Sequence, residues 1–118
     1  MTISEPTTLI TDYMLGTLSE LCAVLLIKQN RVLRHRSVQW WAFAWLAAAV
    51  ASYAGGTYHG FQHALEPAVA AVLWKVTTIS MGVASFFLLT SAITSAFAGQ
   101  DRRWLIAAAA LKLVIYVV

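Results

Sequence analysis

Charged side chains are scarce in this sequence. Among its 118 residues only 8 are Lys or Arg and 5 are Asp or Glu, whereas 60% are hydrophobic. A soluble domain is usually about one quarter charged, because polar side chains must cover its surface. The composition therefore predicts a single all-α domain, residues 1–118, that forms an integral membrane helical bundle with the lipid bilayer around it.

Other absences exclude particular kinds of site. Cys22 is the only cysteine, which excludes an internal disulfide and a cysteine metal cluster. The sequence contains no glycine-rich phosphate loop and no G-x-S-x-G nucleophile elbow. Aromatic and basic residues do not interleave as they do in nucleic-acid-binding segments, so we expect no nucleic-acid partner.

Four apolar segments are present, and a transmembrane helix needs about 20 mostly apolar residues. They cover about residues 8–27, 38–63, 68–97 and 104–118. The net charge of +3 is explained by two basic loops, KQNRVLRHR and AGQDRR, which lie between apolar segments. The positive-inside rule places both loops in the cytoplasm and the N-terminus outside, in what we expect to be a bacterial plasma membrane.

The fourth segment is short. About 15 residues at about 1.5 Å each reach about 22 Å, less than the hydrocarbon core of about 30 Å. Either this helix stops inside the bilayer, where a homo-oligomer would shield it, or the chain is the first part of a longer protein with further C-terminal helices. The sequence favours the second interpretation.

Three polar residues lie at a similar depth in different segments. Asp12, His59 and Lys75 each fall about 6–10 Å below the outer end of their segment. Charged groups inside a membrane usually face the bundle interior and indicate function or specific pairing. We interpret them as an outer-leaflet polar site with Asp12 as the candidate catalytic group. An Asp12–Lys75 ion pair and a Lys75 side chain that extends to the headgroups are the structural alternatives.

Small residues recur every four positions in the second segment, at Ser52, Gly56 and Gly60. This spacing predicts a helix face on which a neighbouring backbone packs closely. His59 and His63 lie beside that face at H-x-x-x-H spacing, which can direct two imidazoles toward one metal ion. Alternatively, His59 forms a hydrogen bond to another helix and His63 is an interfacial, solvated residue.

A second pair of charges lies nearer the cytoplasmic side. Glu20 in the first segment and Lys112 in the fourth are each about 10–12 Å from the inner ends of their segments. Opposite charges at matched depth predict an ion pair that joins these two helices.

The motifs GGTYHGF, TDY and LWK resemble those of an uncharacterised family of bacterial multi-pass membrane proteins. That family in turn resembles the CREST superfamily, which includes alkaline ceramidases and adiponectin-receptor-like proteins. The resemblance implies seven helices, zinc as cofactor and hydrolysis of a lipid amide or ester, with His59 as a zinc ligand. The sequence departs from the superfamily pattern because Gly55 stands where a serine is expected and a late H-x-x-x-H is absent.

Three functions remain open at this point. The first is a metal-dependent lipid hydrolase, in which a zinc-bound water would attack the substrate. The second is a transporter or sensor subunit whose polar pathway contains a histidine that exchanges protons near neutral pH. The third is a membrane assembly protein whose polar residues only hold helices together.

Overall fold

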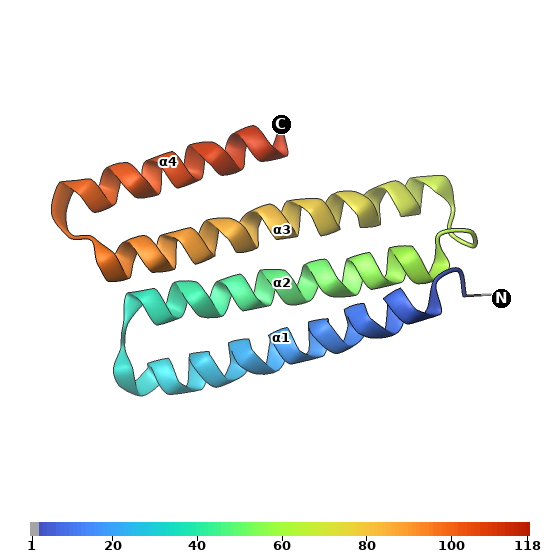
Figure 1. The fold of residues 1–118 in the computed structure, drawn as a ribbon, viewed down its shortest axis with the longest axis horizontal. Coiled ribbons are helices and arrows are strands. Elements are labelled where there is room, and N and C mark those ends of the chain that lie inside the picture. The colour runs from blue at the N-terminus through green and yellow to red at the C-terminus, as the bar shows by residue number, and fades with distance from the viewer. Residues whose placement is uncertain (1–2) are drawn as a thin grey trace.

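The computed structural model describes residues 3–118, which form four α-helices and no strand (Figure 1). The helices are α1 (Pro6–Leu33), α2 (Arg36–Phe61), α3 (Pro67–Ala96) and α4 (Gly99–Val117). One helix corresponds to each predicted apolar segment, so the predicted all-α class is confirmed.

Local sequence explains where the helices begin and end. Pro6 and Pro67 stand in the first turns of α1 and α3, where the fixed φ of proline suits a helix and its missing N–H is not needed. α1 ends where Arg34 adopts φ 52°, the left-handed conformation that stops a helix. The N–H of Arg34 donates to the Asn30 carbonyl at 2.8 Å.

Two predicted boundaries need correction. α2 ends at Phe61, so His63 lies in the following turn and not on the helix. α4 begins at Gly99 and not at Trp104, and its first turn carries Asp101, whose charge complements the helix N-terminus. Its 19 residues extend about 28 Å, but the added first turn is the polar GQDRR, so the apolar part of the helix keeps the predicted length.

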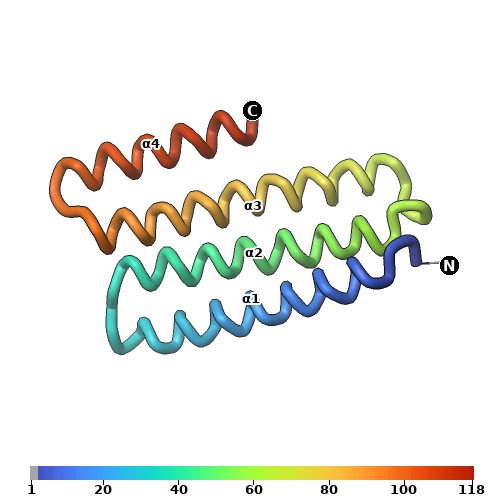
Figure 2. Tube along the Cα trace, viewed as in Figure 1, coloured from blue at the N-terminus to red at the C-terminus, as the bar shows by residue number. Residues whose placement is uncertain are grey.

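The four helices lie in a row (Figures 1 and 2). Each helix contacts only its neighbours in the chain, so α1 contacts α2, α2 contacts α3, and α3 contacts α4. The Cα atoms extend over 55 × 33 × 17 Å, which describes a flat layer rather than a closed bundle. Both broad faces of the layer therefore lack a covering helix within residues 3–118.

Two of the four helices, α1 and α3, are long and apolar enough to cross a membrane. By length and composition alone this is weak evidence, because core helices of soluble proteins and signal sequences share these properties. However, only 17% of the most apolar stretch of each helix is buried, unlike a soluble core helix. The structure thus supports a membrane span for two of the four helices, and the four-span bundle predicted from the sequence is not confirmed.

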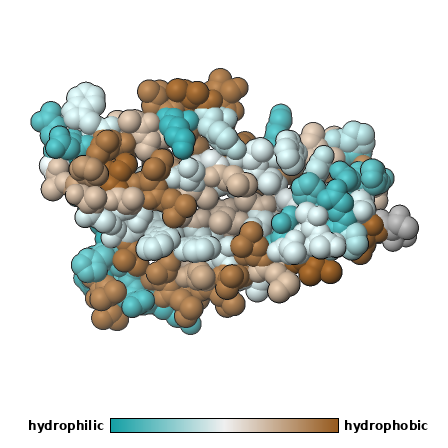
Figure 3. Space-filling view, viewed as in Figure 1, coloured by the Kyte–Doolittle hydropathy of each residue, from teal (hydrophilic) through white to brown (hydrophobic). Residues whose placement is uncertain are grey.

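The surface supports the same interpretation. Hydrophobic residues cover the edges formed by α1 and α4, and hydrophilic residues gather toward the two ends of the layer (Figure 3). Exposed large apolar side chains occur along α1 and α4, including Met14, Leu18, Leu25, Leu111 and Ile115. Apolar surface this extensive is unusual on a soluble monomer.

α1 and α2 pack closely because glycines leave space for the opposite helix. A Cβ atom on Gly56 would lie 2.9 Å from Asp12 Cβ, and one on Gly60 would lie 2.9 Å from Leu9 Cδ1. The reverse contact occurs at Gly16, where a Cβ would lie 2.9 Å from the Tyr53 ring. Real Cβ atoms essentially never approach other atoms this closely, so a side chain at Gly56 would push α1 away from α2, whereas at Gly60 and Gly16 the Leu9 or Tyr53 side chain would have to shift.

α2 and α3 are joined by aromatic and hydrogen-bonded contacts near the start of α2, beside the basic turn between α1 and α2. Trp40 stacks on Phe87 with ring centroids 5.7 Å apart, and Phe43 lies 5.7 Å from the same ring. The buried hydroxyl of Ser91 donates to the Ser37 carbonyl at 2.8 Å. These contacts fix the position of α3 beside α2.

Alanine at Gly56 is expected to destabilise the chain, whereas alanine at Gly55 is not. At Gly56 the added Cβ forces α1 and α2 apart, which costs about 1–3 kcal/mol of unfolding free energy. At Gly55 the added Cβ would lie 3.3 Å from Thr77 Cγ2, and the higher helix propensity of alanine offsets this milder contact. Thermal unfolding of both variants in one detergent measures the difference. Equal melting temperatures would contradict the close α1–α2 approach.

Candidate functional site

A cavity of about 440 Å³ lies between α1, α2 and α3. We call it the Asp12 cavity. Its polar lining residues are Asp12 from α1, Ser52 and His59 from α2, and Thr77 and Ser85 from α3. Its other walls are mainly apolar and include Leu15, Ala51, Met81, Ala84 and Leu88. The structure therefore brings two members of the predicted outer polar site, Asp12 and His59, to one cavity.

Asp12 reaches the cavity across the glycines of α2. A Cβ atom on Gly55 would lie 3.7 Å from Asp12 Oδ2, so the carboxylate lies against a part of α2 that carries no side chain. Because Gly55 and Gly56 are both buried, this stretch of α2 leaves space for the acidic group. The glycines thus position Asp12 as well as the two helices.

Lys75 does not join this site. Its side chain is exposed, and it does not line the Asp12 cavity. Within residues 3–118, the single contact closer than 4.0 Å between a basic side-chain nitrogen and a carboxylate oxygen joins His59 and Glu5. The structure therefore does not form the Asp12–Lys75 pair that matched depth suggested.

His59 is held from the other side by the segment that precedes α1. Its Nδ1 atom lies 3.4 Å from Glu5 Oε2, and the Gln62 side chain donates to Glu5 Oε1 at 3.4 Å. The Ser4 N–H also donates to the Gly60 carbonyl at 2.8 Å, which ties this segment to the end of α2. His59 therefore connects the Asp12 cavity with an acidic partner that lies outside the cavity lining.

Sequence reasoning missed Glu5. It stands directly before Pro6, in a position that indicates only the start of a helix. Its contact with His59 depends on the segment folding back over the end of α2, and no periodicity in the sequence reports such a contact. Tyr58 and Trp74 also pack edge-on against the His59 ring, with centroids 5.4 and 6.5 Å away.

Of the two histidines predicted as metal ligands, only His59 lines the Asp12 cavity. His63 is exposed in the turn after α2 and does not line the Asp12 cavity. No group of three or more His, Cys, Asp or Glu side chains that could hold a metal ion occurs in residues 3–118. Residues 3–118 therefore do not by themselves supply the three ligands of the zinc centre that the CREST resemblance implies.

Ser52 shares the cavity with His59 but cannot form a catalytic pair with it. The two residues lie on one helix, about 10.5 Å apart along its axis. A serine nucleophile and its histidine base must be within about 3 Å of each other. The combination of hydroxyl, imidazole and carboxylate is thus suited to binding polar groups along the cavity.

Glu20 and Lys112 have partners other than each other. Tyr53 donates its hydroxyl to Glu20 Oε2 at 3.1 Å, and it lies 3.2 Å from Thr17 Oγ1. Lys112 donates to Ser85 Oγ at 3.4 Å. Because α1 and α4 are not in contact, the predicted Glu20–Lys112 ion pair is not present in this structure.

A family profile matches residues 7–118 of the sequence, and the family is described as one of unknown function, DUF6962. The chain belongs to this family. No curated protein and no solved structure shows significant similarity to this chain. Membership of DUF6962 agrees with the uncharacterised family expected from the sequence motifs, whereas no match links the chain to the CREST superfamily.

Replacement of Tyr53 by Phe is expected to lower the unfolding free energy by about 1 kcal/mol, because the hydroxyl bonds to Glu20 and Thr17 across the α1–α2 interface. Tyr58→Phe is the matched control, since the Tyr58 hydroxyl makes no hydrogen bond to the part of the chain described here. Thermal or denaturant unfolding in detergent measures both variants. A Tyr58→Phe loss as large as that of Tyr53→Phe would contradict the assigned hydrogen bonds.

The separation of Glu20 from Lys112 predicts that substitutions at these positions act independently. In a double-mutant cycle with Glu20→Gln and Lys112→Met, we expect the two effects on unfolding free energy to add within about 0.5 kcal/mol. The cycle is measured from four unfolding curves under identical conditions. A coupling energy above about 1 kcal/mol would restore the ion pair that matched depth suggested.

Proposed function

We propose that this DUF6962 protein is a four-span membrane protein whose Asp12 cavity binds the head of an amphiphilic, lipid-like molecule. The observation that carries the proposal is the lining of that cavity, in which Asp12 and His59 lie among apolar side chains. Such a cavity combines a few fixed polar groups with hydrophobic walls, as small-molecule sites usually do. This function falls in the sensor or transporter class.

The arrangement of the row supports four membrane spans. α1 and α3 are the two candidate spans and run in the same direction, so a chain that crosses with both must return between them (Figure 1). α2 lies between them and has a similar length, 26 residues against 28 and 30. α4 then runs back beside α3. The α1–α2 and α3–α4 turns, which carry the basic residues, lie at the same end of the helices. We therefore place that end of the helices in the cytoplasm of a bacterial cell and the Asp12 cavity toward the outer side.

The chemistry of the lining favours a hydrogen-bond-donating or cationic head. An ionised carboxylate only accepts hydrogen bonds, and none of the residues that line the Asp12 cavity is Lys or Arg. An amine on the ligand would supply the cation and the donors that Asp12 requires. The apolar walls from Leu15, Met81 and Leu88 would then pack against a hydrocarbon chain.

The cavity also lies beside lipid. It is formed by only three helices of a single layer, so its lining is not enclosed by a second layer within residues 3–118. A molecule dissolved in the bilayer would therefore reach Asp12 by lateral movement between α1 and α3.

Hydrolysis of a lipid amide or ester is the function that the CREST resemblance suggests, and the chemistry present supports it less well. The described residues group no three metal ligands, and Ser52 is too far from His59 for a nucleophile–base pair. A structural role in membrane assembly is the remaining alternative. It predicts that substitutions in the Asp12 cavity change stability without changing ligand binding.

Photolabelling with amphiphiles of one chain length and different heads tests the proposal. A photoactivatable long-chain amine is expected to label peptides of α1, α2 and α3 in the reconstituted wild type, and the matching fatty acid to label them weakly. Asp12→Asn preserves the shape but removes the charge, so we expect amine labelling to fall about tenfold. Asp101→Asn removes a carboxylate outside the cavity and is the control.

Equal labelling of Asp12→Asn and wild type, or equal labelling by amine and fatty acid, would contradict the proposed binding site. Release of fatty acid from an N-acyl long-chain amine, lost in His59→Ala, would instead establish hydrolysis.

A further inference from the structure

A second polar cavity lies at the turn between α1 and α2, at the end of the helices where the basic turns are found. It measures about 470 Å³, and we call it the Arg34 cavity. Arg31, Arg34 and Arg36 line it together with His35, and none of its eight lining residues is acidic. Arginine stays charged at all physiological pH values, so three permanent cations converge on one concave surface. Like charges gathered in this way favour a bound anion.

The turn that presents these arginines is held in one conformation. The Asn30 side chain accepts the His35 N–H at 2.8 Å, and the Asn30 carbonyl accepts the Arg34 N–H at 2.8 Å. Arg34 itself has φ 52°, a left-handed conformation that glycine adopts readily and that residues with a Cβ atom rarely adopt. The chain therefore carries a guanidinium at a position where glycine would be less strained. Strain of this kind accumulates at binding sites.

The N-terminus of α2 adds to the positive potential. Arg36 is its first residue, the cap residue His35 makes no side-chain capping bond, and the first turn carries no acidic residue. Unpaired backbone N–H groups at a helix start attract anions, and here they adjoin the three arginines.

Below the cations the cavity becomes apolar. Ile27 and Phe43 form this part of the lining. Trp40 and Trp41 lie in the same stretch of α2, and Trp41 is half exposed. Tryptophan is common at the level of the lipid headgroups. A ligand that fits this gradient has an anionic head and a hydrocarbon portion beneath it.

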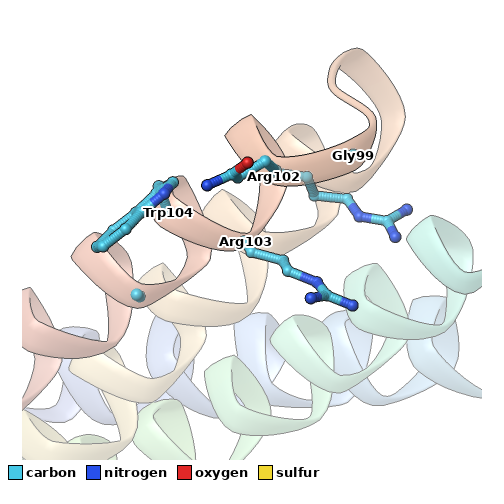
Figure 4. A pocket seen from close by; sticks show the side chains of 6 residues that line it. Gly99, Arg102, Arg103 and Trp104 are labelled. Carbon is cyan, nitrogen blue, oxygen red and sulfur yellow. The ribbon is translucent and has the colours of Figure 1, made fainter.

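The neighbouring turn repeats this combination of cations and tryptophan. Arg102 and Arg103 line a cavity with Trp104 at the start of α4, and their side chains extend to the same side, away from the tryptophan ring (Figure 4). The α1–α2 and α3–α4 turns lie at the same end of the helices (Figure 1). That end is therefore suited throughout to an anionic lipid surface.

We propose that the Arg34 cavity binds the phosphate of an anionic phospholipid headgroup. Arg31, Arg34 and Arg36 hold the phosphate, and Ile27 and Phe43 contact the first carbons of the lipid below it. This site is separate from the Asp12 cavity, and its occupancy does not depend on what that cavity binds. A free phosphate ion would satisfy the same cations but would not use the apolar part of the lining.

The test measures binding to the full chain, purified in a maltoside detergent, by native mass spectrometry and thermal shift. The probes are dioctanoyl phosphatidylglycerol, dioctanoyl phosphatidylcholine and inorganic phosphate. We expect phosphatidylglycerol to bind at least tenfold more tightly than the other two. Arg34→Gly removes one cation and relieves the left-handed strain, so we expect a higher melting temperature without lipid and about tenfold weaker phosphatidylglycerol binding.

Two further variants separate the site from general charge. Arg36→Gln removes a lining cation while the turn conformation stays unchanged, and it should weaken binding by a similar factor. Lys28→Gln removes one exposed positive charge from α1 outside the lining, and binding should change less than twofold. Wild-type affinity in Arg34→Gly, or an equal loss in Lys28→Gln, would overturn the proposal. Displacement of phosphatidylglycerol by inorganic phosphate at similar concentration would overturn the lipid assignment and identify a free-phosphate site.

Discussion

The close approach of α1 to α2 is the contact on which the candidate site depends. The backbone of Asp12 can approach α2 this closely because Gly56 carries no side chain, since a Cβ atom there would lie 2.9 Å from Asp12 Cβ. The same approach brings Tyr53 within hydrogen-bonding distance of Glu20. A polar group buried among apolar residues is costly unless it has partners, so the packing and the polar contacts of these two helices must form together. Any substitution that separates α1 from α2 would therefore alter the cavity as well as the stability.

The single-layer arrangement leaves the polar residues of the cavities uncovered by a second layer of helices within residues 3–118. In a closed four-helix bundle each helix contacts two others, and its polar residues can be enclosed. Here contacts occur only between helices adjacent in the chain, so groups on α2 are screened by α1 and α3 at the sides alone. If all four helices cross a membrane as proposed, lipid would cover the broad faces, and the proposed lipid-like ligands would reach the cavities from within the bilayer.

The sequence predicted the helices better than their partners. Long apolar segments predict helices, and glycine at four-residue spacing predicts a close helix contact, so both features could be predicted from the sequence. The polar contacts between helices could not be predicted in the same way. Matching residues by depth assumes that any two helices can meet, and in a row this fails for Glu20 on α1 and Lys112 on α4. The contact of Glu5 with His59 was also missed, because it requires the chain before α1 to fold over the end of α2.

The two cavities show that opposite local rules can both accompany a polar cavity. At the Asp12 cavity glycine stands where a side chain would be expected, and the missing atoms let a carboxylate enter the space between helices. At the Arg34 cavity a long side chain stands where glycine would be expected, and this residue lines the cavity together with Arg31 and Arg36. Selection for stability alone would favour the reverse choice at Arg34, since glycine relieves the positive φ. The cation at that turn is therefore not explained by the stability of the turn, whereas both the positive-inside rule and the proposed phosphate site account for it.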